Sequence, residues 1–233
     1  MRSLKNFFSD AIHFFYPHIC TGCGSDLLGK QELLCLKCLA HLPHTQFEKY
    51  VDNPIEKIFT GRFPLKAGSS EFYFSKSQVI QQLIHQLKYK GNKEIGFYLG
   101  AMMGKNILAS PRFSTFDFLI PLPLYADKEF KRGYNQAEII CNGMSSVMQI
   151  PVLTKNIIRH RSTQTQTHKH RTERWENVVG SFAVNNAAAL INKNILLVDD
   201  VITTGATLEA CCQTLLQVPG ITVSVATLAI ASK

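Results

Sequence analysis

The most regular hydrophobic pattern of the chain lies near its C-terminal end. Four consecutive apolar residues, 195–198, are typical of a strand buried on both faces, as in parallel sheets. A short turn rich in hydroxyl groups follows at residues 203–207. The next apolar positions recur at helical spacing: Leu208, Cys211, Cys212, Leu215 and Leu216. The pattern therefore predicts a strand, a turn and a helix in succession.

Apolar spacing elsewhere predicts further strands that alternate with helices. The predicted helices cover residues 77–89, 93–109 and 136–148. The predicted strands include the Phe72/Phe74 alternation and residues 116–120, 152–158, 180–184 and 221–230. Residues 159–178 are polar and have no clean period. This alternation predicts an α/β fold, with a mostly parallel sheet covered by helices on both faces.

The cysteines add a second, smaller unit. Four of the seven form the pairs Cys20-x-x-Cys23 and Cys35-x-x-Cys38, with 11 residues between them. Two such turns can complete a tetrahedral thiolate shell for zinc, and four sulfur ligands leave no open position, so the site would be structural. Two disulfides or an iron–sulfur cluster are the alternatives. The remaining cysteines fall on apolar helix faces and are predicted to be core residues: Cys141, Cys211 and Cys212.

Composition limits the class of protein and of partner. With 233 residues, 45% of them hydrophobic, the chain can bury one core and a small appendage. Its net charge of +8 favours acidic partners such as nucleotides, polyphosphates or nucleic acid. No run of about 18 apolar residues predicts a transmembrane segment, and the first residues lack a signal-peptide core. We therefore expect a cytoplasmic protein.

The predicted organisation has three parts. Residues 1–45 hold a short amphipathic helix and the zinc ribbon, residues 46–76 form a connector and a strand, and residues 77–233 form the α/β domain. The apolar face of the first helix packs on the protein or lies at a membrane surface: Leu4, Phe7, Phe8, Ile12 and Phe15.

The turn after strand 195–198 has the chemistry of a sugar-phosphate site. Backbone N–H groups at the start of a helix favour an anion, and Gly205 allows the backbone to approach it closely. The adjacent carboxylates of Asp199 and Asp200 can accept hydrogen bonds from two neighbouring sugar hydroxyls. A 5-phosphorylated ribose presents both kinds of group, whereas an ordinary turn with solvated aspartates is the alternative. The phosphate would be held by Thr203, Thr204, Gly205, Ala206 and Thr207.

These residues resemble a known motif. The acid pair and its turn are similar to the phosphoribosyl diphosphate (PRPP) motif of type I phosphoribosyltransferases. Over nearly the whole chain, the order of motifs resembles the ComF family of competence-associated proteins. The segments that carry this resemblance are the two cysteine pairs, Pro121-Leu122-Pro123-Leu124, Arg132-Gly133-Tyr134-Asn135-Gln136-Ala137, Gln166…Arg174…Asn177…Gly180-x-Phe182 and the acid-pair turn.

The resemblance implies PRPP bound together with Mg²⁺, and a structural zinc ion in the ribbon. It places the loop that handles diphosphate after strand 116–120, where Arg132 and Lys131 are the candidate catalytic cations. It also places a catalytic loop in the polar segment 159–178, where Gln166 and Arg174 match the family pattern. Cations of this kind stabilise the charge of a departing diphosphate.

Three functions stay open at this point. The first is a glycosyltransferase that moves phosphoribose to an unidentified nitrogen acceptor during DNA uptake for natural transformation. The second is a catalytically inactive phosphoribose-binding module. The third, implied by the resemblance, is a module that binds single-stranded DNA, with a competence helicase as a further partner. The sequence does not indicate an oligomeric state.

Overall fold

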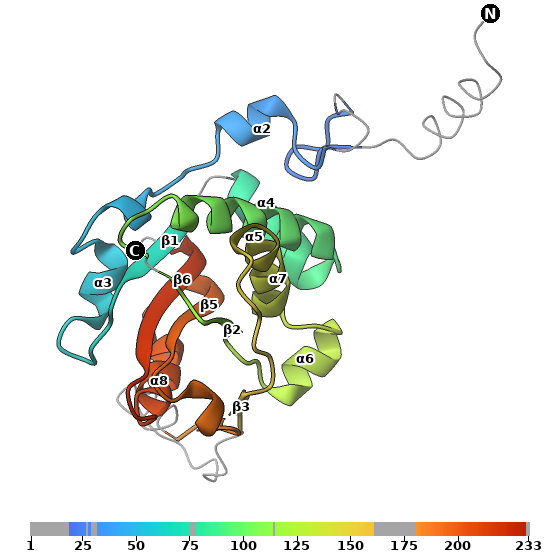
Figure 1. The fold of residues 1–233 in the computed structure, drawn as a ribbon. Coiled ribbons are helices and arrows are strands. Elements are labelled where there is room, and N and C mark those ends of the chain that lie inside the picture. The colour runs from blue at the N-terminus through green and yellow to red at the C-terminus, as the bar shows by residue number, and fades with distance from the viewer. Residues whose placement is uncertain are drawn as a thin grey trace, which may run out of the picture.

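The computed structural model describes residues 19–26, 28, 32–74, 78–113, 115–160 and 180–231. Its centre is a four-stranded parallel sheet in the order β1-β6-β5-β2 (Figure 1). The strands of this sheet are β1 (Gly68–Tyr73), β2 (Phe118–Pro121), β5 (Asn194–Ile202) and β6 (Thr222–Ile230). A short antiparallel pair lies beside it, formed by β3 (Ile157–Arg159) and β4 (Phe182–Val184).

Helices cover both faces of the sheet (Figure 1). One face packs against α4 (Gln78–Tyr89), α5 (Lys93–Leu108) and α7 (Gln136–Met148). The other packs against α3 (Pro54–Phe59) and α8 (Ala206–Leu215). Strand β5 contributes side chains to the hydrophobic cores on both faces of the sheet. Leu196 and Val198 face the α4, α5 and α7 layer, and Ile195 and Leu197 face α3 and α8, all at 0% exposure. The predicted α/β class and the two-sided burial of this strand are confirmed.

Close backbone approach joins α5 to α7. A Cβ atom on Gly143 would lie 2.1 Å from the carbonyl oxygen of Phe97, and one on Gly100 would lie 2.3 Å from that of Ile140. Atoms cannot approach so closely, so both positions require glycine. The two helices therefore form one tight layer, on which α4 also packs.

The remaining described elements are short. They are α2 (Leu36–Ala40), the 3₁₀ turn η1 (Phe47–Lys49), α6 (Ala126–Arg132) and the 3₁₀ turn η3 (Ala188–Leu190). Among the described residues, no helix combines the length and the apolar character needed to cross a membrane. The predicted amphipathic helix of residues 1–15 lies outside the described residues.

Two strands differ most from those predicted, whereas the other helices and strands predicted by residue range shift by at most two residues at their ends. Strand β5 continues to Ile202, so the acid pair lies inside the strand and not after it. The ladder to β6 continues past the acids, with Asp199 opposite Thr227 and Ile202 opposite Ile230, and these bonds hold the polar residues extended. Strand β3 begins at Ile157, five residues after the start of the predicted strand 152–158. Of the residues before it in that range, Val152 makes an isolated bridge to Leu119 of β2.

Candidate active site

Helix α8 begins at a turn that only glycine fits. Gly205 is the N-cap with φ +78°, and a Cβ atom there would lie 2.7 Å from Ile58 and 2.8 Å from Phe59. Its carbonyl accepts the N–H of Glu209 at 2.8 Å, which starts the helix. A hollow of about 50 Å³ lies at this turn, lined by Asp199 and residues 201–208. The unpaired N–H groups of the first turn and the helix dipole make the hollow suitable for an anion.

The acid pair connects this turn to the opposite helical layer. The Oδ2 of Asp200 lies 2.9 Å from Nζ of Lys88 in α4. The Oδ1 of Asp199 accepts the backbone N–H of Asp200 at 2.8 Å. Because successive strand residues point to opposite faces, Asp200 turns toward α4 while Asp199 lines the hollow near α8. The two carboxylates therefore stand on either side of the end of one strand.

Burial and the neighbouring Asp200 carboxylate raise the pKa of Asp199 to about 8. The N–H of Asp200 and the charges of Lys88 and Arg159 act in the opposite direction. Asp199 therefore carries a proton over much of the neutral range unless a bound cation or a hydrogen-bond donor changes its surroundings.

Arg159 is the cation at the end of β3. Its guanidinium carbon lies 4.0 Å from the centre of the Tyr125 ring and 5.1 Å from that of Phe182. Its Nε is buried without a hydrogen-bond partner among the described residues. Stacking on aromatic rings fixes a guanidinium plane and leaves its N–H groups available. Nothing in the described part of the chain accepts the Nε–H of Arg159, so this donor is available near Asp199.

The predicted diphosphate-handling cations lie on a helix and not on the loop expected from the sequence. Lys131 and Arg132 belong to the last turn of α6. Arg132 Nη1 donates to Gln136 Oε1 at 2.5 Å, and its guanidinium carbon lies 5.5 Å from the centre of the Tyr89 ring. Lys131 is exposed. The other predicted catalytic residues, Gln166 and Arg174, lie outside the described residues.

Three contributors to this site had no predicted role of their own. Tyr125 and Arg159 lie in the segments expected to handle diphosphate and to form the catalytic loop, whereas Lys88 lies outside every predicted site segment. Lys88 lies in the last turn of α4, and no local sequence pattern indicates that it pairs with an aspartate 112 positions later. Tyr125 could have been suspected, because it follows the Pro-Leu-Pro-Leu segment that the family resemblance includes. The available signal for Arg159 was its place at the end of a strand that enters a basic segment.

The four predicted cysteine ligands come together. The sulfur atoms of Cys20, Cys23, Cys35 and Cys38 all lie within 4.8 Å of one another, a set that could hold a zinc ion. Burial raises the pKa of the Cys20 thiol, but backbone N–H donors, led by that of Cys35, outweigh this and lower it to about 6. A thiolate is thus already favoured at one position of the set.

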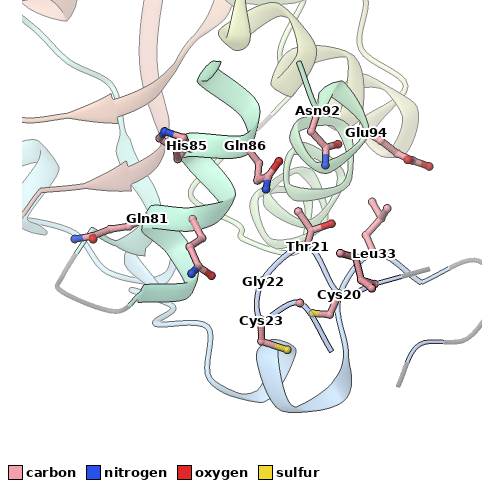
Figure 2. A pocket seen from close by; sticks show the side chains of 13 residues that line it. Cys20, Thr21, Gly22, Cys23, Leu33, Gln81, His85, Gln86, Asn92 and Glu94 are labelled. Carbon is pink, nitrogen blue, oxygen red and sulfur yellow. The ribbon is translucent and has the colours of Figure 1, made fainter. Parts of the chain in front are cut away.

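The cysteine turn packs against α4. A Cβ atom on Gly22 would lie 3.3 Å from Val79 of that helix and 3.0 Å from the sulfur of Cys38. Figure 2 shows the cavity of about 1060 Å³ between this turn and the α4–α5 pair, with Gln81 and Gln86 among the residues of α4 that line it. The predicted core cysteines are confirmed, each at 0% exposure: Cys141, Cys211 and Cys212.

Comparison with known proteins agrees with this geometry. The phosphoribosyl transferase domain family matches residues 132–232, which contain the acid pair and the turn. DNA utilization protein YhgH of Escherichia coli O157:H7 is 30% identical over 146 residues, 61% of this chain and 63% of the relative. Competence protein F of Haemophilus influenzae is 36% identical over 97 residues, 39% of this chain and 40% of the relative. These matches support a phosphoribosyltransferase-like protein similar to the ComF family.

Competence protein ComFC of Bacillus subtilis is a further ComF-family relative, 28% identical over 152 residues, 62% of this chain and 56% of that protein. The matches thus span less than two thirds of the relatives' length. Among solved structures, the chain is similar to a glutamine PRPP amidotransferase from B. subtilis complexed with ADP and GMP. That similarity has a TM-score of 0.41 at 14% identity and covers 61% of this chain and 30% of the other.

The raised pKa of Asp199 predicts a defined dependence of stability on pH. A carboxyl that binds its proton more tightly when folded stabilises the fold most below the unfolded pKa, and loses that contribution as pH rises toward 8. We therefore expect Asp199→Asn to gain in stability relative to the wild type between about pH 5 and 8, by at most about 1.4 kcal/mol per pH unit.

The measurement is urea unfolding of both proteins across pH 5 to 9. The difference should level off above pH 8, and Asp117→Asn serves as the control because the N–H of Asn194 and the charge of Lys193 lower the pKa of Asp117. A difference that stays constant from pH 5 to 9 would show that Asp199 titrates normally.

Proposed function

We propose that this ComF-like protein binds PRPP with Mg²⁺ and transfers its phosphoribose to a nitrogen nucleophile, in a process that serves DNA uptake. The observation that carries the proposal is the meeting of an anion-binding helix start with two carboxylates at the end of β5. The names of the relatives, a competence protein and a DNA utilization protein, support the biological role.

The turn would hold the 5-phosphate of the sugar. The side chains of Thr203 and Thr204 are exposed, and Thr207 is half-buried within the first turn of α8. Hydroxyl and N–H donors of this kind match the acceptor oxygens of a phosphate. The left-handed backbone of Gly205 brings these donors around a single point, where Gly205 itself and Ala206 contribute backbone only.

Asp199 and Asp200 would fix the ribose from its hydroxyl side. Lys88 holds the Asp200 carboxylate in place through an ion pair, in a position to accept hydrogen bonds. Asp199 faces the phosphate hollow, so a sugar spanning both groups would lie across the end of β5. Magnesium would reach the site on the ligand's own oxygens, as this ion prefers, and would neutralise the diphosphate.

Cations around the site would stabilise the leaving diphosphate. Arg159 is the best placed of the described residues, because it stacks on Tyr125 of the β2–α6 connection and its charge acts on Asp199. Arg132 and Lys131 stand farther along α6 and would reach the diphosphate from its outer side. Gln166 and Arg174 complete the proposed catalytic set. Positive charge aimed at the departing group lowers the barrier to cleavage of the sugar–oxygen bond.

We also propose that the four cysteines hold a structural zinc ion. Thiolate sulfurs are the ligands that zinc prefers, and a set of four closes the coordination shell. Lys37, between the last two cysteines, would offset part of the surplus negative charge. The ion would fix the turn that packs on Val79 of α4.

A second candidate function is the binding of single-stranded DNA. Arg132 stacks over Tyr89, whose side chain is 64% exposed, and the ring of His85 lies 5.0 Å from that of Tyr89. An exposed aromatic ring next to a cation can stack a nucleobase and contact its phosphate. We call Arg132, Tyr89 and His85 the DNA strip. It leads from α6 along α4, so DNA bound there would lie beside the proposed transfer site. A competence helicase would be the matching protein partner.

Replacement of Asp200 should weaken PRPP binding. We expect Asp200→Asn to lose at least about tenfold in affinity for PRPP with Mg²⁺, because it loses the carboxylate that Lys88 positions. Titration calorimetry measures this, and Asp117→Asn, a lysine-paired aspartate at the start of β2, is the matched control and should bind normally. Release of diphosphate over a panel of nitrogen acceptors then separates a transferase from a binding module. An unchanged affinity in Asp200→Asn would remove the ribose assignment.

Loss of the cysteine ligands should release the metal. Elemental analysis of the purified protein should find about one zinc ion per chain, and Cys20→Ser with Cys23→Ser should reduce this by at least about tenfold. Cys141→Ala, which alters a buried cysteine outside the set, should keep its zinc. Iron in place of zinc, or paired thiols without metal, would refute the zinc assignment in favour of a cluster or disulfides.

The DNA strip predicts two separable effects. Tyr89→Ala should weaken the binding of an oligothymidine by about 1–3 kcal/mol without changing its salt dependence, since only stacking is lost. Arg132→Gln should instead reduce the slope of log K against log salt by about 0.7. Fluorescence anisotropy at several salt concentrations measures both, with the exposed Tyr50→Ala as control. Equal loss in the Tyr89 and Tyr50 variants would exclude this strip.

A further inference from the structure

A separate cavity lies beside β1, the edge strand of the sheet opposite β2. Its volume is about 600 Å³, within the range of small-molecule sites. The walls come from the segment before and within η1, from β1 and from the C-terminal end of α5. The polar residues that matter are His44, Glu48, Glu71, Asn106 and Ser110. None of them belongs to the PRPP-like site.

Glu71 is the fixed acceptor of this cavity. It is 4% exposed, and its Oε1 accepts from His44 Nδ1 at 2.8 Å and from Asn106 Nδ2 at 2.7 Å. A carboxylate acceptor requires the proton of neutral His44 to sit on Nδ1, which leaves Nε2 as an acceptor. The ring is held in this position by Phe72, with ring centres 4.9 Å apart.

Glu48 is the feature that points to a missing ligand. It is 5% exposed, and among the described residues its carboxylate has no hydrogen-bond or ion-pair partner. Its main chain is fixed, because its carbonyl accepts the hydroxyl of Ser110. Its oxygens are not among the fully buried atoms that lack a partner, so they reach the cavity space. A carboxylate so largely withdrawn from bulk water is normally paired with a cation or a donor.

The cations nearest in sequence have partners other than Glu48. Lys49 lines the cavity, but its Nζ donates at 3.1 Å to Oε1 of Gln46, which lies on the same wall. Arg112 forms an ion pair with Glu56 and donates to the carbonyls of Phe47 and Tyr50. The C-terminal end of the 16-residue helix α5 adds partial negative charge beside the cavity. The cavity thus combines two largely buried carboxylates, a histidine acceptor and a helix C-terminus with a single lysine, Lys49, among its described lining residues, in a chain whose net charge is +8.

We propose that this cavity binds a small organic cation with several N–H donors, an amine or a guanidinium compound, held between Glu48 and Glu71. Ammonium and guanidinium groups carry donors only, which matches a lining with acceptors at Glu48, at Glu71 and at Nε2 of His44. An anion such as a nucleotide phosphate would meet like charge here, so the ligand class differs from that of the PRPP-like site.

The test is titration calorimetry of the full chain with agmatine, putrescine and spermidine, and with triethylene glycol as an uncharged probe. We expect saturable binding of at least one cation, weakened tenfold or more in Glu48→Gln and unchanged in Glu129→Gln, an exposed glutamate on α6. Glu48→Gln keeps the shape of the side chain, and its thermal unfolding confirms that the variant is folded.

Three results would overturn the proposal. One is that no cation in the panel binds with a dissociation constant below about 1 mM. Another is binding that Glu48→Gln leaves unchanged. The third is Glu48-dependent binding of an arginine-containing peptide but of none of the free cations, which would instead assign the cavity to a basic side chain of a protein partner. PRPP affinity should be the same in the wild type and in Glu48→Gln, so this test stands apart from that of the transferase.

Discussion

Strand β5 is buried on both faces and yet carries two adjacent carboxylates in its C-terminal half, and the rest of the site depends on how that charge is accommodated. The hydrophobic layers fix the strand, because its side chains fill both cores. Among the described residues, Asp200 forms an ion pair with Lys88 of α4. Asp199 lies on the other face, where burial and the Asp200 carboxylate raise its pKa to about 8. The two acids therefore have different surroundings although they are neighbours in sequence.

This difference gives the two aspartates separate parts in the proposed chemistry. An acid positioned by a lysine is a ready acceptor for a hydroxyl group, whereas an acid with a raised pKa, such as Asp199, gains its charge when the site fills. Arg159, held by stacking on Tyr125, stands close enough to favour that ionisation. A cation arriving with the ligand would act in the same direction, so ligand binding and the loss of the Asp199 proton are linked.

The sequence predicts the features that local pattern determines. The β5 strand, the turn and α8 were predictable because burial, glycine and helical spacing all lie within about 20 consecutive residues. The cysteine set was predictable because its spacing alone places sulfurs together. Lys88 and Arg159 were not, since their partners are distant in the sequence and only the fold brings them to β5.

Helix α6 shows why a loop was expected where the structure has a helix. It has no buried residue and hence no apolar stripe to reveal its period, and its Phe130 is 89% exposed. Its stability comes from its ends instead. Acidic residues occupy its first turn and basic residues its last, which suits the helix dipole, and Gly133 closes it in the left-handed conformation.

Helix α4 connects the two chemical centres of the molecule. Val79 at one end lies against the cysteine turn, and Lys88, nine residues later and about 13 Å along the axis, holds Asp200. A rigid helix transmits the position of one end to the other, because its backbone hydrogen bonds resist bending. The cysteine turn and the α4–α5 layer also share one hydrophobic core. The metal proposed for the ribbon would therefore stabilise more than the ribbon: by fixing the start of α4, it would help to hold the lysine that pairs with Asp200.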